Sequence, residues 1–484
     1  MTQLHINGTW KGATGGGVRE IHCPADRSLV GTVAEATIPD ALEAIDAAKA
    51  AFDSGWWKQI SVIERGQILE RTAQLMEERL EDFAKAESLD TGKRIVEARY
   101  DIADSIRCIR YFAQLGPTFS GRKVDTGSSA IESRVQYEPV GVAVLITPWN
   151  YPLLQATWKV APAIAAGCTF ILKPSELTPH TSIMFMQALI DAGLPAGVGN
   201  LILGAGTEIG DTLTSSPHVD MVSFTGGLNT GKRVMASAAG TIKKVALELG
   251  GKNPNIIFAD ADLDVALDNA LTAVFLHSGQ VCSAGSRLII EESIHDQFVT
   301  ELVARAQRIK LGGPFDDEAE TGALISADHL KKVHAFVTAG VAEGATLLCG
   351  GTPLEGPGYF YPPTILGNCT SDMRCVQDES FGPVLTIETF TTEQEAISLA
   401  NDTYYGLAGA VWTQDAGKSQ RVANALRHGT IWINDFHPYV PQAEWGGFKQ
   451  SGIGRELGPN GLLEYLEAKH VYQNTEPAPS GWFK

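Results

Sequence analysis

A cysteine and a glutamate in the middle of the sequence have the residue types that covalent catalysis on a carbonyl compound requires. Cys282 lies in the segment GQVCSAG over residues 279–285, where flanking glycines allow a ligand to approach the backbone closely. Glu248 opens the segment ELGGKNP over residues 248–254 and could transfer protons. The pair therefore favours a nucleophilic thiol that works with a nearby acid or base.

Cys282 could instead be a structural cysteine, a disulfide partner or a metal ligand. Most cysteines are buried and inert, and this is the alternative explanation for Cys282. The chain has seven scattered cysteines and no C-x-x-C, which predicts neither disulfides nor zinc and favours the reducing cytoplasm. It also lacks G-x-S-x-G, which marks the nucleophilic serine of hydrolases, and H-E-x-x-H, which binds zinc. We therefore expect neither a hydrolase of that type nor a bound metal.

Asn150 follows a predicted strand over residues 141–146, in the loop TPWNYP over residues 147–152. Its side-chain amide could donate a hydrogen bond to an oxyanion, and removing one such donor typically costs about 10²- to 10³-fold in rate. An Asx turn would explain the same residue equally well. The aromatic residues of this loop would by default belong to the core.

The hydrophobic pattern predicts two α/β domains. Helical spacing covers residues 40–52, 62–87 and 181–192, and β-rich runs cover residues 141–146, 169–172, 200–203 and 221–224. Further strands are expected over residues 255–258, 287–290, 384–387 and 429–433. Strands that alternate with helices indicate parallel sheets covered on both faces. The polar, alternating segment 123–137 instead predicts a hairpin arm that meets a partner chain.

Two glycine-rich turns and one ion pair could hold a dinucleotide. The turn GAGTEIG over residues 204–210 is one residue longer than G-x-G-x-x-G and is a weak signal. The turn FTGG over residues 224–227 precedes a helix, whose free N–H groups suit a pyrophosphate. Lys173 and Glu176 follow a strand and could bond a ribose diol, which would disfavour an added 2′-phosphate. Ordinary turns and a surface ion pair are the alternatives.

Length and charge exclude several classes of protein. With 484 residues the chain exceeds the size at which single cores stop growing, so two or more domains are expected. The formal charge of −18 argues against nucleic acid and anionic membranes as partners, because both need a basic surface. No stretch approaches about 18 consecutive apolar residues, and the amino terminus lacks a signal-peptide pattern. We therefore expect neither a membrane span nor secretion.

Seven motifs together resemble the NAD(P)-dependent aldehyde dehydrogenase superfamily in order and approximate spacing, over nearly the whole chain. They are PWNYP (148–152), KPSE (173–176), FTG (224–226), ELGGK (248–252), GQVC (279–282), ESFGP (379–383) and GRELG (454–458). The resemblance implies that Cys282 attacks an aldehyde, Asn150 holds the oxyanion and Glu248 activates the hydrolytic water. It also places Lys159 and Glu456 at the proton-relay positions of the superfamily.

The resemblance further implies that the cofactor is NAD, with NADP disfavoured by Glu176. Lys173 and Glu176 match the residues that grip the adenosine ribose, and Glu379 matches the one that holds the nicotinamide ribose. Position 227 departs from the pattern, because many relatives have a serine hydroxyl where this chain has glycine. The implied cofactor-binding residues are Ile146, Thr147, Trp149, Lys173, Ser175, Glu176, Gly206, Gly210, Phe224, Gly226, Gly227, Leu249, Glu379 and Phe381.

Within the superfamily, three stretches most resemble the bacterial type of betaine-aldehyde dehydrogenase. They are PLLQATWK (152–159), SGQVCSAGSR (278–287) and WINDFHPY (432–439). This likeness implies an aromatic substrate pocket formed by Tyr151, Trp158, Tyr439 and Trp445. Each aromatic face attracts a trimethylammonium group by about 0.5–2 kcal/mol. Betaine aldehyde is thus the first expected substrate, ω-aminoaldehydes the second and other aldehydes the third.

Two features complicate the substrate assignment. Glu444 stands where relatives usually have proline, and could select cations or face solvent. The helix that contributes the acidic residues 101 and 104 also carries arginines at positions 107 and 110. Two rival functions are a CoA-acylating semialdehyde dehydrogenase, whose relatives usually lack the base at Glu248, and a non-catalytic binding protein, which the intact Cys282 and Asn150 disfavour.

The resemblance implies an α/β aldehyde dehydrogenase fold: a Rossmann-like parallel-sheet cofactor domain, an α/β catalytic domain and a small β oligomerisation element. The expected boundaries are 1–121 and 140–250 for the NAD-binding domain, 251–450 for the catalytic domain, and 122–139 with 466–484 for the oligomerisation element. The alternating tail 469–474 could add a strand across a subunit boundary. The expected partners are thus a small-molecule aldehyde and further copies of this chain, in a homodimer or homotetramer.

Overall fold

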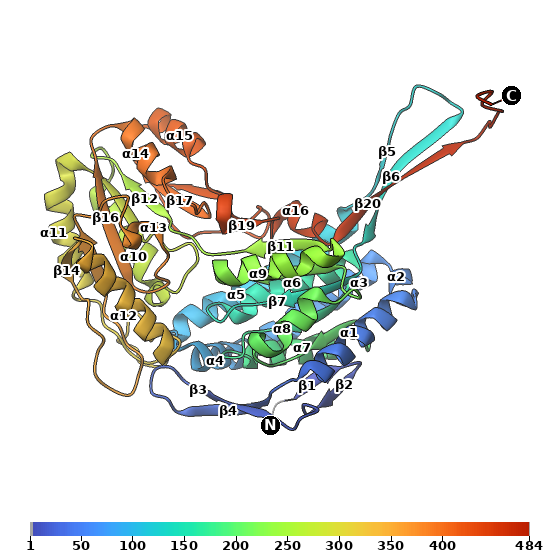
Figure 1. The fold of residues 1–484 in the computed structure, drawn as a ribbon, viewed down its shortest axis with the longest axis horizontal. Coiled ribbons are helices and arrows are strands. Elements are labelled where there is room, and N and C mark those ends of the chain that lie inside the picture. The colour runs from blue at the N-terminus through green and yellow to red at the C-terminus, as the bar shows by residue number, and fades with distance from the viewer. Residues whose placement is uncertain (1–2, 484) are drawn as a thin grey trace.

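Two sheets organise the computed structural model, which describes residues 3–483 (Figure 1). The first sheet has the strand order β19 (Gly452–Ile453), β11 (Lys244–Glu248), β10 (Met221–Thr225), β7 (Val142–Ile146), β8 (Thr169–Lys173), β9 (Gly199–Leu201), β1 (Leu4–Ile6) and β2 (Thr9–Lys11). Strands β11 to β9 run parallel, while β19 and β1 pair antiparallel at the two sides. Strands β7, β8 and β10 are buried at every position, as expected for a sheet covered by helices on both faces.

The helices of this lobe come mainly from the first half of the chain. They are α1 (Ile38–Asp53), α2 (Trp56–Gln59), α3 (Val62–Glu78), α4 (Leu80–Thr91), α5 (Ile95–Leu115), α6 (Pro152–Ala166), α7 (His180–Asp191), α8 (Gly206–Ser215), α9 (Leu228–Ala238) and α16 (Gly458–Leu463). The expectation of one continuous helix over residues 62–87 is wrong. Arg79, at φ −120° and ψ 23°, separates α3 from α4. Strong helix formers on both sides of the break hide it in the sequence.

The second sheet, together with its helices, forms the other lobe. Its strand order is β14 (Thr346–Cys349), β15 (Thr364–Gly367), β16 (Val384–Phe390), β13 (Arg287–Glu291), β12 (Pro254–Ile257), β17 (Ala408–Trp412) and β18 (Thr430–Ile433), and only β14 pairs antiparallel among these described strands. The helices are α10 (Leu263–Phe275), α11 (His295–Ala306), α12 (Ala327–Ala342), α13 (Arg374–Gln377), α14 (Glu393–Asn401) and α15 (Ala416–Ala425). The prediction of two α/β units with parallel sheets is confirmed.

An arm projects from the first lobe, and the chain ends at its tip (Figure 1). It consists of β5 (Arg122–Lys123), β6 (Ile131–Pro139) and β20 (Leu466–Asn474). The predicted hairpin and the predicted tail strand are both present. Strand β20 pairs along its whole length with β6 of the same chain and forms an edge of this three-stranded sheet. A separate two-stranded ribbon, β3 (Val18–His22) with β4 (Leu29–Ala34), runs along the first lobe.

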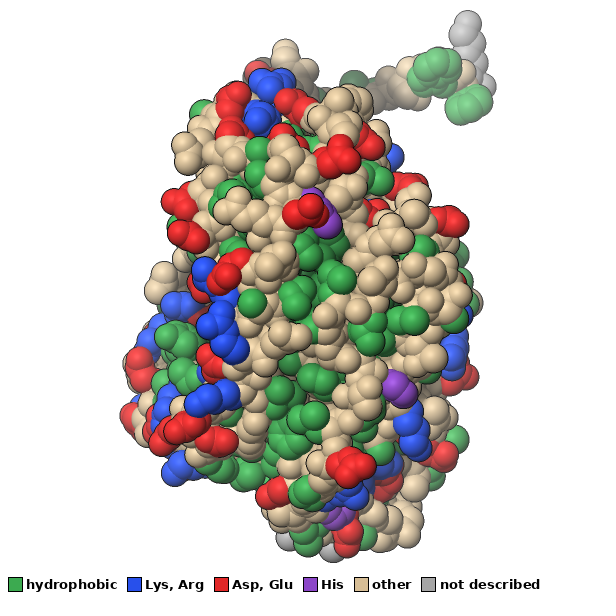
Figure 2. All heavy atoms as spheres, turned by 90° about the vertical axis from the view of Figure 1, so that its left-hand side faces the viewer, with side chains coloured by type: hydrophobic (Ala, Val, Ile, Leu, Met, Phe, Trp, Pro, Cys, Tyr) green, Lys and Arg blue, Asp and Glu red, His purple; other side chains and the backbone are tan. Residues whose placement is uncertain are grey.

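The surface of the second lobe shows acidic and basic side chains interspersed around its edges, with uncharged residues between them (Figure 2). No extended basic area is visible on this face. Among residues 3–483, no helix is both long and apolar enough to cross a membrane.

Candidate active site

Cys282 lies in a short loop between α10 and β13, and a left-handed turn leads the chain into it. His277, Ser278 and Gly279 have φ values of 48°, 52° and 70° in succession. Only glycine fits the third position, because a Cβ there would lie 2.2 Å from the carbonyl oxygen of Gly382. The turn thus seats the nucleophile loop against the ESFGP segment, in which Gly382 lies.

Two asparagines bond to the backbone of this loop. Asn150 donates from Nδ2 to the carbonyl oxygen of Gln280 at 2.9 Å, and Asn253 donates from Nδ2 to the carbonyl oxygen of Cys282 at 2.9 Å. An amide carries two hydrogens, so Asn150 keeps a second donor. Both side chains are buried, and they tie the loop to the segment after β7 and to the residue before β12.

Glu248 ends β11 and is buried near an ion pair between Lys159 and Glu456. Its Oε2 has no hydrogen-bond partner among residues 3–483. Burial and then the charge of Glu456 raise the pKa of Glu248 well above its ordinary value, while Lys159 lowers it. A carboxylate whose pKa is raised binds a proton more tightly than an ordinary one, as a general base requires.

The thiol of Cys282 is partly accessible, yet the surrounding protein disfavours its thiolate. Burial raises the pKa of Cys282 to about 12, and the carboxylates of Glu379 and Glu248 add to the rise. Cys282 is therefore a thiol at neutral pH, and a base or a bound positive charge must assist its ionisation.

The parallel strands of the first sheet end at a site suited to a dinucleotide. Lys173 at the end of β8 lies 3.6 Å from Glu176, measured between Nζ and Oε2. Gly227 precedes α9, and a Cβ there would meet no atom within 4 Å. Thr147 follows β7, and its buried Oγ1 has no partner among the described residues. Open space at a helix N-terminus and an unpaired hydroxyl both fit a phosphate-bearing ligand.

Glu379 closes the side of this site nearest Cys282. Its Oε1 accepts a hydrogen bond of 3.0 Å from the backbone N–H of Gly251. A Cβ on Gly250 would lie 2.0 Å from Glu379 Oε2, so any larger residue there would displace this carboxyl group. The ring of Phe381 contacts that of Trp149 at 5.2 Å between centroids. The remaining predicted cofactor residues lie at or after the carboxyl ends of neighbouring strands: Ile146, Ser175, Gly206, Gly210, Phe224, Gly226 and Leu249.

Three of the predicted substrate residues form one aromatic cluster. The centroid of Trp158 lies 5.3 Å from that of Tyr439 and 6.0 Å from that of Trp445, and Tyr439 and Trp445 are 6.4 Å apart. Trp445 also exchanges two backbone hydrogen bonds with Glu456, at 2.7 and 2.8 Å. The cluster therefore adjoins the buried carboxyl groups.

Tyr151 stands apart from this cluster, against different neighbours. Its ring lies 5.6 Å from that of His277 and 4.2 Å from Lys93 Nζ. Burial and then the charges of acidic neighbours raise the pKa of Tyr151 well above its ordinary value, and Asp101 and Cys282 are among the contributors. Tyr151 thus lies between the nucleophile and the acidic residues of α5.

Glu444 contacts the start of helix α16. Its Oε1 accepts a hydrogen bond of 3.4 Å from the backbone N–H of Asn460, in the first turn of α16. A carboxylate near a helix N-terminus is electrostatically favourable. Glu444 therefore interacts with α16.

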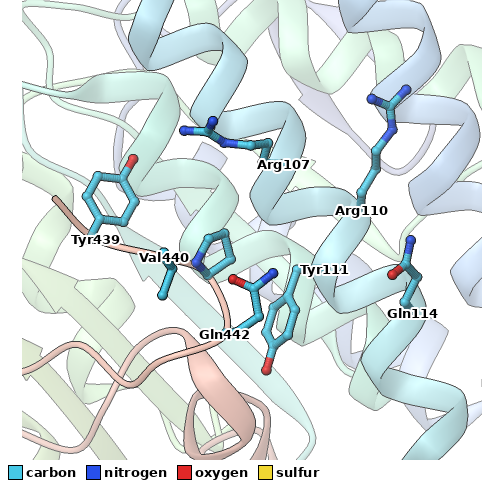
Figure 3. A pocket seen from close by; sticks show the side chains of 8 residues that line it. Arg107, Arg110, Tyr111, Gln114, Tyr439, Val440 and Gln442 are labelled. Atoms are coloured by element: carbon cyan, nitrogen blue, oxygen red, sulfur yellow. The ribbon is translucent and has the colours of Figure 1, made fainter.

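A cavity of about 410 Å³ lies on the outer side of Tyr439 (Figure 3). It separates α5 from the loop 439–442, and the arginines of α5 stand at its rim. In Figure 3 the Arg107 side chain extends toward Tyr439, whereas Arg110 points away. The cavity therefore meets the aromatic cluster at Tyr439.

Several polar residues of the site were not among the sequence predictions. Lys93 and Glu87 are fully buried beside Asp101, and Asn253 and His277 shape the nucleophile loop. Asn253 belongs to the ELGGKNP segment and could have been noticed there. Lys93 lies in the link between α4 and α5, where no pattern points to a site. All seven cysteines are unpaired, and residues 3–483 contain no cluster of three or more His, Cys, Asp or Glu that could hold a metal ion.

Comparisons with known proteins agree over the whole chain. Residues 10–471 match the aldehyde dehydrogenase family. The chain is 55% identical to betaine aldehyde dehydrogenase of Bacillus subtilis over 99% of both chains. It is 42% identical to the peroxisomal aminoaldehyde dehydrogenase 2 of Pisum sativum, covering 100% of this chain and 97% of that protein. A crystal structure of Staphylococcus aureus betaine aldehyde dehydrogenase in complex with NAD⁺ superposes with a TM-score of 0.99 at 49% identity, covering 100% of this chain and 97% of that one. The chain belongs to the aldehyde dehydrogenase family, whose members oxidise aldehydes.

Proposed function

We propose that this protein oxidises betaine aldehyde to glycine betaine, with NAD as the hydride acceptor. The observation that carries the proposal is the cluster of Trp158, Tyr439 and Trp445 beside the buried carboxyl groups. Aromatic faces attract a quaternary ammonium group without needing a hydrogen-bond donor on it. Full-length similarity to the Bacillus and Staphylococcus betaine aldehyde dehydrogenases supports the same substrate.

In the proposed reaction, Cys282 attacks the aldehyde carbon and gives up its proton to a base. The carbonyl oxygen becomes an alkoxide, which Asn150 and the backbone N–H of Cys282 stabilise by hydrogen bonds. NAD, when bound, accepts the hydride that the tetrahedral carbon releases as the C=O bond reforms. The product of this step is a thioester on Cys282.

Water then hydrolyses the thioester. Glu248 takes a proton from the attacking water, and the C–S bond breaks to release the carboxylic acid and the Cys282 thiolate. The proton leaves Glu248 toward the Lys159–Glu456 pair. The raised pKa of Glu248 suits a group that must alternate between its two protonation states.

The preference for NAD follows from the adenosine-ribose end of the site. Glu176 beside Lys173 would accept hydrogen bonds from a ribose diol, and its charge would repel the 2′-phosphate of NADP. The remaining predicted cofactor residues, the aromatic substrate residues and the catalytic roles above form part of this proposal.

ω-Aminoaldehydes are the second candidate substrates. The likeness to pea aminoaldehyde dehydrogenase and the presence of two carboxylates on α5, Asp101 and Asp104, support them. A third, broad-specificity alternative would make the aromatic cluster merely structural.

Steady-state kinetics test the proposal. We expect kcat/KM to be highest for betaine aldehyde, lower for 3-aminopropanal and lowest for 3,3-dimethylbutanal, which has the same shape as betaine aldehyde but no charge. A kcat/KM tenfold higher for any aliphatic or aromatic aldehyde would show the substrate assignment to be wrong. NAD should give the higher kcat/KM of the two cofactors. Acid should form equally fast with and without CoA, whereas an acyl-CoA product would identify an acylating enzyme.

We also infer that the chain forms a homodimer or homotetramer through its arm, because the arm leaves the first lobe and ends with exposed Trp482 and Phe483. We further propose three domains, which correspond to the two sheets with their helices and to the arm. Their boundaries are 1–121 with 140–250, 251–450, and 122–139 with 466–484. Seven unpaired cysteines support a reducing compartment such as the cytoplasm. Size-exclusion chromatography with light scattering, on the intact chain and on a chain lacking residues 475–484, tests the assembly.

A further inference from the structure

Two carboxylates of α5 lie near the proposed substrate pocket. Asp104 Oδ2 accepts a hydrogen bond of 2.5 Å from the hydroxyl of Tyr439, which belongs to the aromatic cluster. Asp101 lies one turn earlier and bonds to the lysine that stands over the Tyr151 ring. Free carboxylates at these positions would suit a substrate with N–H donors.

Neither carboxylate is free, because each is engaged by a cation of the same chain. Lys93 Nζ lies 2.5 Å from Asp101 Oδ2 and 3.8 Å from Glu87 Oε1, and its side chain is entirely buried. Arg107 is hydrogen-bonded and ion-paired to Asp104 Oδ1. The buried Lys93 thus binds Asp101, and Arg107, which lines the outer cavity (Figure 3), binds Asp104.

The two classes of cation differ in what they demand from such a pocket. A primary ammonium group loses hydrogen bonds to water from three N–H donors and needs acceptors in return. A trimethylammonium group has no N–H donor, so aromatic faces alone can compensate for its weaker hydration. A pocket that offers rings but occupied carboxylates therefore favours the quaternary cation.

We propose that Lys93 and Arg107 determine specificity, by masking Asp101 and Asp104 so that the pocket selects quaternary over primary ammonium aldehydes. This inference rests on the proposed function and adds residues that do not themselves hold the substrate. It predicts that removing either mask shifts the preference toward ω-aminoaldehydes.

Arg107 provides the first test, because its side chain is 65% exposed and its replacement should not disturb folding. In Arg107→Gln, the ratio of kcat/KM for 3-aminopropanal to that for betaine aldehyde should rise about three- to tenfold, as an acceptor becomes available. The matched control is Arg110→Gln, which removes the same charge one turn away. Arg110 pairs with Glu70 and Glu77 on α3, so the control ratio should change less than about twofold.

If the ratio of the two kcat/KM values does not change in Arg107→Gln, the proposal is overturned. It is also overturned if the ratio rises equally in Arg107→Gln and Arg110→Gln, because that result would reflect only the loss of net charge. Lys93→Met provides an independent test and should raise the ratio in the same direction, with the melting temperature confirming a folded enzyme. If Lys93→Met folds and keeps the wild-type ratio, the role of Lys93 is refuted. If it does not fold, the arginine variants decide alone.

Failure of this inference is distinguishable from failure of the proposed function. A wild-type enzyme that prefers neutral aldehydes contradicts the proposed function itself. A wild-type enzyme that prefers betaine aldehyde, with variants that keep the same ratio, contradicts only the masking.

Discussion

The ammonium group of Lys159 and the carboxylate of Glu456 form an ion pair enclosed beneath Glu248. The side chain of Lys159 is 0% exposed and that of Glu456 is 5% exposed. Lys159 also donates a hydrogen bond of 3.1 Å to Ser223 Oγ. Glu456 Oε2 and Glu248 Oε2 both lack partners among residues 3–483. With so little water between them, the charges of the pair act strongly on the proposed base.

Replacing Glu456 by glutamine should shift the acid limb of the pH dependence of kcat to lower pH. After burial, Glu456 is the largest cause of the raised pKa of Glu248, and Lys159 opposes it. Removing the carboxylate leaves the ammonium unopposed, so Glu248 would ionise at lower pH. Glu464→Gln serves as the control, because Glu464 raises the same pKa more weakly and should give a smaller shift. An acid limb that does not move in Glu456→Gln contradicts the coupling.

Replacing Glu379 by glutamine should speed alkylation of Cys282 by iodoacetamide in the absence of cofactor. Burial, then Glu379, raises the pKa of Cys282 to about 12. Burial raises the pKa of Glu379 itself to about 7, so this carboxyl is ionised at pH 9 and its loss matters there. The expected change is about three- to tenfold at pH 9, measured by mass spectrometry of the labelled peptide. The control Cys282→Ala should show neither labelling of that peptide nor NADH formation. If Glu379→Gln is labelled at the same rate as wild type, the electrostatic effect of Glu379 on Cys282 is refuted.

The proposed catalytic and cofactor residues could be located in the sequence because they follow predicted strands. Asn150, Lys173 and Glu248 each lie at or just after the carboxyl end of a buried, parallel strand. Apolar runs reveal such strands, and parallel strands deliver their end residues to one edge of the sheet. The short motifs PWNYP, KPSE and ELGGK then indicated which of the residues after each strand belong to the site.

Other features depend on contacts between segments that are distant in sequence. Lys93 meets Tyr151 only because α5 packs against α6, and no periodicity encodes that contact. The pairing of β20 with β6 likewise joins two segments from distant parts of the chain. The left-handed turn at His277 contains two residues without glycine's freedom, so composition gave no signal for it.

Replacing Trp445 by leucine should reduce kcat/KM for betaine aldehyde by about three- to thirtyfold, the loss expected for one cation–π contact. The neutral 3,3-dimethylbutanal should lose much less, because it fills the same space without a charge. Trp482→Leu is the matched control, since Trp482 is 84% exposed near the end of the chain. Equal losses for the charged and neutral substrates would mean that Trp445 only shapes the pocket.

Replacing Glu87 by glutamine should change how stability depends on pH. Burial raises the pKa of Glu87 to about 7, from an ordinary value of 4.5. The folded protein therefore holds this proton more tightly, and the associated stability is fully present below pH 4.5 and lost as pH rises through about 7. Glutamine does not titrate, so the melting temperature of Glu87→Gln relative to wild type should increase between pH 5 and pH 8, by an amount equivalent to at most about 3 kcal/mol. The control Glu78→Gln, at an exposed position of α3, should show no such trend. If the melting-temperature difference between Glu87→Gln and wild type does not change with pH, Glu87 is already ionised in the folded enzyme at pH 5.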